Sequence, residues 1–175
     1  MMWRTHALIG VTSLWALAPL PDVITHDTLG PLCALAALGA LLPDLDAVES
    51  KAKSLRIGQI RPLAPLSAIA FRTWGHRTLL HSPLGFLIAG ICFLPVGVGW
   101  GIGPFLALWL GYGSHLLADA CTKTGIPSWP NHVNRRFHLL PPRFRFTTGT
   151  HAEDMLFPIL ALPVLLLLLL HLTVI

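Results

Sequence analysis

Apolar residues are concentrated in five runs along the chain, and long polar stretches separate the second run from the third and the fourth from the fifth. The runs cover residues 7–20, 28–42, 82–98, 102–118 and 155–175. Each of the last three is about as long as a helix needs to cross some 30 Å of hydrocarbon. The first two are shorter, and they predict either a tilted pair of helices extended by flanking residues or a re-entrant hairpin.

These runs predict an all-α integral membrane protein with about five transmembrane or re-entrant helices in a single domain, residues 1–175. The expected helices cover approximately residues 6–20, 28–43, 80–98, 102–120 and 152–175, with cytoplasmic loops at 44–79 and 121–151. The first run has an alternative interpretation, because Arg4, an apolar stretch and the small residues of Ala16–Leu17–Ala18 are typical of a cleaved signal peptide. We interpret this run as a retained helix.

The composition favours a protein that lies in the lipid bilayer. Hydrophobic residues make up 54% of the sequence and charged residues only 11%, whereas a soluble domain usually carries about 25% charged residues. The same apolar richness excludes a disordered chain. The 9 histidines outnumber the 8 acidic residues, which is an unusual ratio for a protein that lies in lipid.

The basic residues indicate the orientation of the chain in the membrane. With five crossings, the N-terminus and the two long loops share one face. All 12 Lys and Arg residues lie on this face, at Arg4, Lys51, Lys53, Arg56, Arg61, Arg72, Arg77, Lys123, Arg135, Arg136, Arg143 and Arg145. The positive-inside rule therefore predicts that the N-terminus is cytoplasmic and the C-terminus is outside.

The loop after the fourth run combines aromatic and basic residues, with strict alternation in Arg143–Phe144–Arg145–Phe146. Aromatic side chains beside Arg are typical of the headgroup region, where membrane lipids supply phosphate. A nucleic acid would also suit such a loop, but lipid phosphate lies nearer, so no nucleic-acid partner is expected. Thr150 and Glu153 then have the spacing of a capping box that would start the last helix.

Four groups of ionisable residues lie at the ends of apolar runs. They are Thr5–His6, Pro43–Asp46, His76–Ser82 and His115–Asp119, with Thr122 after the last. A single Asp or His at a helix end is ordinary as a cap or an interfacial residue. His115 and Asp119 are harder to explain in this way, because their i, i+4 spacing places them on one face of a helix. They also lie in an apolar run, where ionisable groups are costly and usually functional.

In the topology that Lys and Arg indicate, all four groups lie on the cytoplasmic side at one depth. Histidine and aspartate form a mixed nitrogen and oxygen ligand set suited to Zn²⁺ or a similar divalent ion, with manganese or iron as alternatives. The predicted ligands are His6, Asp44, Asp46, His76, His81, His115 and Asp119. This set exceeds the needs of one tetrahedral zinc ion, so one or two ions are expected. The candidates for supporting groups around the ligands are Ser82, Thr122 and Glu153.

The same segments resemble the YdjM family. The resemblance rests on Leu42–Pro43–Asp44–Leu45–Asp46, on His76–Arg77–Thr78–Leu79–Leu80–His81–Ser82 and on the segment from Gly111 to Asp119, and it covers essentially the whole chain. The family comprises bacterial and archaeal inner-membrane proteins described as metal-dependent hydrolases and also labelled LexA-binding. The resemblance implies a cytoplasmic-membrane location and a metal site built from the seven ligands. The ligand pattern is also similar, more loosely, to that of the all-helical zinc-dependent phospholipase C enzymes.

The predicted function is a membrane-embedded metal-dependent hydrolase acting on a phosphoester or other ester of a lipid or amphiphile at the cytoplasmic interface. In this hypothesis Asp46 accepts a proton from the attacking water, and Arg77 binds a phosphate or stabilises the developing oxyanion. The first alternative is a non-catalytic metal sensor or a scaffold for a cytoplasmic regulator. A metal-ion transporter ranks third, because the outer halves of the runs are almost purely apolar. The expected partners are membrane lipids. The expected substrate is a lipid or another amphiphile.

Overall fold

A computed structural model describes residues 2–46, 79–130 and 135–172, and this part of the chain is mainly helical. Its α-helices are α1 (Trp3–Thr12), α2 (His26–Leu41), α4 (Pro83–Trp100), α5 (Ile102–Ala120) and α6 (His151–Leu172). Short 3-10 helices form η1 (Ser13–Leu17), η2 (Pro43–Asp46) and η3 (Pro142–Phe144). Two short strands, β1 (Ile126–Pro127) and β2 (Arg136–Phe137), pair antiparallel, with Ile126 opposite Phe137.

Each of the five apolar runs forms a helix, but the first two helices differ from their expected bounds. The first run is divided into α1 and η1. The hydroxyl groups of Thr12 and Ser13 donate to the carbonyl oxygens of Leu8 and Gly10 at 2.9 and 2.6 Å, and such bonds favour a change of helix geometry. The second helix begins two residues before the expected start, because Thr25 and the N3 residue Thr28 form a reciprocal capping box.

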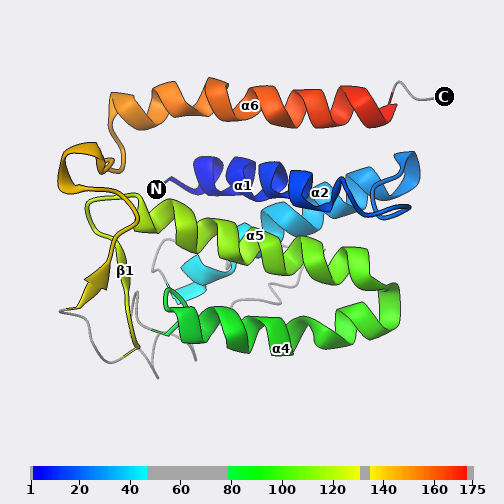
Figure 1. Cartoon of the computed structure of the whole chain (residues 1–175), viewed down its shortest axis with the longest axis horizontal. Helices are drawn as coiled ribbons and strands as arrows, with labels where there is room; N and C mark the ends of the chain where they lie inside the picture. The colour runs from blue at the N-terminus through cyan, green and yellow to red at the C-terminus, as the bar shows by residue number, and fades with distance from the viewer. Residues whose placement is uncertain (1, 47–78, 131–134, 173–175) are drawn as a thin grey trace, which may run out of the picture.

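The helices run side by side in alternating directions (Figure 1). As a result, the start of α1, the end of α2, the start of α4 and the end of α5 all lie at one end of the molecule, on the left of the view. The helix α6 also starts at this end and extends along α1. The described parts of the four segments that carry the ionisable groups are therefore brought to one end, as the alternating direction of the runs predicted.

Close packing of α2 against α5 depends on glycine. A Cβ atom on Gly39 would lie 2.2 Å from the carbonyl oxygen of Leu108, and one on Gly111 would lie 2.1 Å from that of Ala36. Both distances are far inside van der Waals contact, so only glycine allows the two backbones to approach this closely. Small residues at helix crossings are the usual way in which helices associate in lipid, where burial of apolar surface gives no driving force.

Two helices in the described part of the chain are long and apolar enough to cross a membrane, in the windows Pro83–Trp100 and Glu153–Leu170. Most large apolar side chains of both point outward, and Ile91 of α4 is 66% exposed. In water this surface would be a large apolar patch, whereas in a bilayer it contacts lipid. The helix α5 has a similar length but a more polar composition, because it carries Ser114, His115 and Asp119 on its buried face.

An apolar cluster fills the interior towards the other end of the molecule. It is formed by Leu14, Leu17, Leu29, Leu32, Ala36, Ala107 and Leu167, each of them at most 2% exposed. The indole N–H of Trp15 in η1 donates to the carbonyl oxygen of Pro163 at 2.8 Å, which fastens α6 to the same region. The interior of the molecule is therefore apolar towards one end and collects ionisable side chains at the other.

Candidate metal centre

Five of the seven predicted ligands come together at the polar end. They are His6 from α1, Asp44 from η2, His81 from the turn before α4, and His115 and Asp119 from α5. All except Asp44 are at most 1% exposed, and the side chain of Asp44 is 22% exposed. The cluster is thus a buried group of imidazoles and carboxylates with one partly open edge, at Asp44.

Local sequence features hold each ligand in place. His115 and Asp119 are one turn apart on α5, so their side chains lie on the same face. The turn that carries His81 is fixed by the buried hydroxyl of Ser82, which donates to the carbonyl oxygen of Leu79 at 2.7 Å and accepts from the N–H of Gly85 at 3.1 Å. Ser82 is the N-cap of α4, and its supporting role around a metal stays a prediction.

The distances between the polar atoms of the cluster suit one small cation. The Nε2 atoms of His81 and His115 are 3.3 Å apart. The Nε2 atom of His81 lies 3.4 Å from Oδ1 of Asp44, and that of His6 lies 3.4 Å from Oδ1 of Asp119. A tetrahedral ion with bonds of about 2.0–2.1 Å sets its ligand atoms about 3.4 Å apart. The described side chains therefore need little movement to share an ion.

His115 is common to both groups of possible ligands. One group is His6, His115 and Asp119, and the other is Asp44, His81 and His115, with the ligand atoms in each within 4.8 Å of one another. The Nδ1 atom of His115 lies 2.7 Å from the carbonyl oxygen of Ala40. A carbonyl oxygen only accepts, so Nδ1 carries the proton, and the lone pair of Nε2 faces the cluster. A single lone pair serves one ion, so the two groups overlap in one site.

The two ring nitrogens of His6 have different surroundings. Its ring stacks on that of His115 with the centroids 3.8 Å apart and the planes at 17°. Within the described part of the chain, its Nδ1 atom is buried and has no hydrogen-bond partner. A buried polar atom without a partner costs free energy, and an ion held at Nε2, the atom that faces Asp119, would leave this cost in place.

Asp44 supplies an ionised oxygen at the open edge of the cluster. Burial by itself would raise the pKa of this carboxyl group. The hydrogen bond with His81 and the charges of the neighbouring imidazoles outweigh burial and hold the pKa of Asp44 well below its usual range. The group is therefore a carboxylate at neutral pH, which is the form that binds a divalent cation.

Glu153 and Thr122 contact the backbone near the cluster. The carboxylate of Glu153, 1% exposed, accepts from the backbone N–H of Met2 and, at 2.8 Å, from that of Gly149. The hydroxyl of Thr122 donates to the carbonyl oxygen of Asp119 at 2.7 Å. Glu153 thus ties the start of α6 to the residue that precedes α1, and Thr122 closes the end of α5. That Glu153 and Thr122 support the metal ligands stays a prediction.

The capping box predicted at the start of α6 is wrong in detail. The hydroxyl of Thr150 donates to the carbonyl oxygen of Thr147 at 2.8 Å, and the Glu153 carboxylate accepts from Gly149 instead of Thr150. The competing partner is the N–H of Met2, which draws the Glu153 side chain toward α1. Local spacing alone does not reveal a partner that is distant in the sequence.

Three of the predicted site groups are not described by the structure. His76 and Arg77 lie outside the described residues, and of Asp46 only the backbone in η2 is described. Their roles as ligand, phosphate-binding group and general base stay predictions. Two contributors were missed from the sequence, the carbonyl oxygen of Ala40 and the backbone N–H of Met2. Both are main-chain atoms, which side-chain patterns do not reveal.

Comparison with known proteins gives a consistent result over the length of the chain. A family model described as YdjM inner membrane protein matches residues 1–174. The chain is 34% identical over 130 residues to the Inner membrane protein YdjM of Escherichia coli strain K12, a match that covers 72% of this chain but only 63% of that protein. It is 30% identical over 158 residues to the Uncharacterized protein YvsG of Bacillus subtilis strain 168, covering 89% of this chain and 86% of that protein. No solved structure gives a significant match.

Proposed function

The chain belongs to the YdjM family of inner membrane proteins, and from this premise we propose that it is a metal-dependent hydrolase acting at the cytoplasmic surface of the membrane. The orientation of His115 carries the proposal. Its Nδ1–H is held by the Ala40 carbonyl oxygen, and its Nε2 lone pair faces two carboxylates and another imidazole. An N–H fixed by a backbone carbonyl is the usual arrangement around a metal-binding histidine.

The proposed ligands among the described residues are His6, Asp44, His81, His115 and Asp119. The chemistry that a bound divalent ion supplies at such a site is polarisation of an ester or phosphoryl oxygen and activation of water near neutral pH. The set of nitrogen and oxygen donors suits zinc, and also manganese or iron. Asp46 remains the proposed general base, and Arg77 the proposed group that binds a phosphate or stabilises the oxyanion. Binding of a second ion would rest on His76 and Asp46.

The proposed substrate is a phosphoester or other ester of a lipid or amphiphile. An apolar groove of about 260 Å³ supports this substrate class, with Pro83, Leu116 and Ala120 among its lining residues. The latter two directly follow His115 and Asp119 in the sequence, and Pro83 directly follows Ser82. Since the groove lies between α5 and the lipid-facing helix α4, we propose that it holds an acyl chain that enters from the bilayer.

The proposed orientation places the cluster on the cytoplasmic side. Every Lys and Arg of the sequence lies at the N-terminus or in the two long loops. The described ends of the helices beside these segments are at the same end of the molecule as the cluster (Figure 1). The positive-inside rule then favours a multi-pass protein with a cytoplasmic N-terminus and an external C-terminus.

A non-catalytic metal sensor or scaffold is the second candidate. Burial of four of the five ligands to 1% exposure or less favours it, because a site filled by side chains leaves no position for a substrate. The partly exposed Asp44 favours the hydrolase instead. A metal-ion transporter has less support, since the apolar cluster around Leu14, Leu29 and Ala36 lies beyond the site and offers no polar path.

The test is an assay of the purified full-length protein in detergent micelles with phospholipids and a synthetic carboxylic ester, each with added Zn²⁺ or Mn²⁺. We expect metal-dependent turnover by the wild type and a loss of at least about a hundredfold in His115→Ala. His26→Ala is the matched control, because this histidine is 66% exposed and lies at the other end of the molecule. Absence of turnover of any ester with either metal, with His115→Ala behaving like the wild type, would contradict the proposal.

A further inference from the structure

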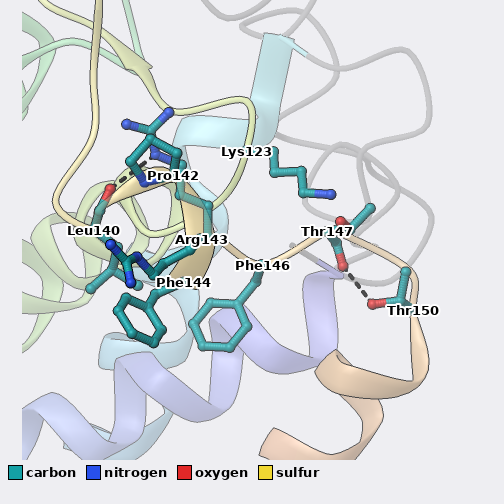
Figure 2. Close-up of a pocket in the computed structure, with 9 residues that line it drawn as sticks. Lys123, Leu140, Pro142, Arg143, Phe144, Phe146, Thr147 and Thr150 are labelled. Atoms are coloured by element: carbon teal, nitrogen blue, oxygen red, sulfur yellow. Dashed lines mark hydrogen bonds between the residues drawn. The ribbon is translucent and has the colours of Figure 1, made fainter.

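A second polar feature lies at the same end of the molecule, outside the metal centre. It is an open cavity of about 840 Å³ between the end of α5 and the start of α6. Figure 2 shows the side chains that surround it. Those that bear on its chemistry are Lys123, Arg143, Phe144, Arg145, Phe146 and Thr147. The alternating segment Arg143–Phe144–Arg145–Phe146 thus supplies four of the residues that line the cavity.

Backbone pairing holds this basic segment against the end of α5. The N–H of Lys123 donates to the carbonyl oxygen of Phe146 at 2.9 Å, and the N–H of Phe146 donates to that of Cys121 at 3.1 Å. The Nε–H of Arg145 donates to the carbonyl oxygen of Leu140 at 2.9 Å, which fixes the plane of its guanidinium group. The two arginines are therefore carried by a segment with a defined position, which pairs with the residues directly after the end of α5.

Among the described residues, no carboxylate pairs with the cations of the cavity. In residues 2–46, 79–130 and 135–172, none of Lys123, Arg143 and Arg145 forms an ion pair with a carboxylate. The guanidinium carbon of Arg143 lies 5.9 Å from the centroid of the Phe144 ring, an arrangement typical of a cation–π contact. Three cations around one hollow repel each other, and an anion between them would relieve this repulsion with charge-assisted hydrogen bonds.

The position of the cavity relative to α6 indicates which anions are near it. Thr150 lines the cavity, and the apolar window of α6 begins at Glu153, which is about 4.5 Å further along the helix axis. Phe144 lines the same cavity and is 61% exposed. Exposed aromatic and basic side chains directly before a membrane span are typical of the headgroup layer.

We propose that this cavity binds the phosphate of an anionic membrane lipid. Arg143, Arg145 and Lys123 contact the phosphate, and the exposed ring of Phe144 lies against the glycerol and the first methylene groups. The site goes beyond the proposed hydrolase function, because binding here requires neither the metal nor turnover. A soluble phosphate ester carries the same recognised group, and the experiment distinguishes the two sources.

The test is native mass spectrometry of the full-length protein in a non-ionic detergent without added metal, titrated with phosphatidylglycerol or with zwitterionic phosphatidylcholine. The variant is Arg143→Gln with Arg145→Gln. The control is Arg135→Gln with Arg136→Gln, which removes the same charge from the same loop outside the cavity. The control also removes a side-chain bond to the backbone, since Arg136 donates to the Thr124 carbonyl oxygen. A monodisperse peak in size-exclusion chromatography establishes that each variant is folded.

We expect the wild type to prefer phosphatidylglycerol, the cavity variant to bind it at least about tenfold more weakly, and the control to bind it as the wild type does. Excess glycerol 3-phosphate should not displace the lipid. Equal affinity for both lipids, or an equal loss in both double variants, overturns the proposal. Displacement by glycerol 3-phosphate, or tighter binding of a short oligoribonucleotide than of lipid, overturns the assignment to a lipid. His115→Ala should retain the lipid, so failure of the hydrolase proposal leaves this result unaffected.

Discussion

His115 takes its orientation from a backbone atom on another helix. Ala40 belongs to the last turn of α2, where the final carbonyl groups have no N–H partner within the helix. Its oxygen is therefore free to accept the Nδ1–H of His115 at 2.7 Å. The end of α2 thus performs two tasks, since it orients one imidazole and leads directly into η2, which carries Asp44. Replacement of Ala40 would alter the site only through changes in the position of its backbone.

At the residue scale, the hydrogen bonds of Glu153 lead to a prediction about stability. In Glu153→Gln, an amide NH₂ replaces one of the two oxygens that accept from the N–H groups of Met2 and Gly149. We expect a loss of about 1–3 kcal/mol, because a buried donor then faces another donor. Thermal unfolding in detergent measures this effect. Asp154→Asn is the control, since the neighbouring carboxylate is exposed, and equal melting temperatures for the two variants would contradict the prediction.

Much of the cluster could be predicted from single residues, and the rest depends on main-chain atoms. The i, i+4 spacing of His115 and Asp119 in an apolar run is visible in the sequence, and the structure places both in the cluster. The Ala40 carbonyl oxygen and the Met2 N–H leave no trace in a side-chain pattern, because every residue has such groups. Their contribution depends on where a helix ends and what packs beside it.

At the scale of elements, the crossing of α2 and α5 determines the geometry of the site. These helices carry the Ala40 carbonyl oxygen on one side and His115 on the other, and they are held together around Gly39 and Gly111. Any added side-chain atom at the crossing must push the two backbones apart. The hydrogen bond that orients His115 would then lengthen, so packing at this crossing and metal binding are coupled.

Gly39→Ala should therefore destabilise the protein and weaken metal binding together. The new Cβ atom would lie 2.2 Å from the carbonyl oxygen of Leu108, and such overpacking costs about 1–3 kcal/mol. Gly30→Ala is the matched control in the same helix, because a Cβ atom there meets no atom within 4 Å. Melting temperatures and metal content of the purified variants test the coupling. A Gly39→Ala protein as stable and metal-rich as Gly30→Ala would show that the crossing is looser.

The hydrophobic pattern predicted the helices better than it predicted their ends. The runs at 82–98 and 102–118 correspond closely to α4 and α5, since Ser82 and the glycine-flanked connection at Gly101 provide clear boundaries. The division of the first run into α1 and η1 was missed. It depends on whether Thr12 and Ser13 bond back to the preceding turn, which composition does not decide.

At the scale of the whole molecule, the ionisable and the apolar side chains of the interior are segregated along its length. One end has the buried imidazoles and carboxylates together with the basic loop segment from Arg143 to Phe146. The interior towards the other end is filled by leucine and alanine. In a bilayer the positive-inside rule favours the proposed orientation, in which the basic end is cytoplasmic.

The orientation leads to a prediction for protein fusions in bacterial cells. A green fluorescent protein fused to the N-terminus should be fluorescent, because it stays in the cytoplasm. Alkaline phosphatase fused to the C-terminus should be active, because it folds with its disulfides only outside the cytoplasm. A non-fluorescent but fully expressed fusion at the N-terminus, or an inactive but fully expressed fusion at the C-terminus, would contradict a five-crossing protein with a cytoplasmic metal centre.

The most direct test of the metal centre is elemental analysis of the purified full-length protein by mass spectrometry, after loading with Zn²⁺ and removal of unbound ion. The wild type and the exposed-histidine variant His26→Ala should each retain at least one ion per chain, and Asp119→Ala should lose it. Size-exclusion chromatography establishes that all three proteins are folded. A folded wild type that retains no divalent ion, or an Asp119→Ala variant that retains as much as the wild type, would show that the cluster is not a metal site.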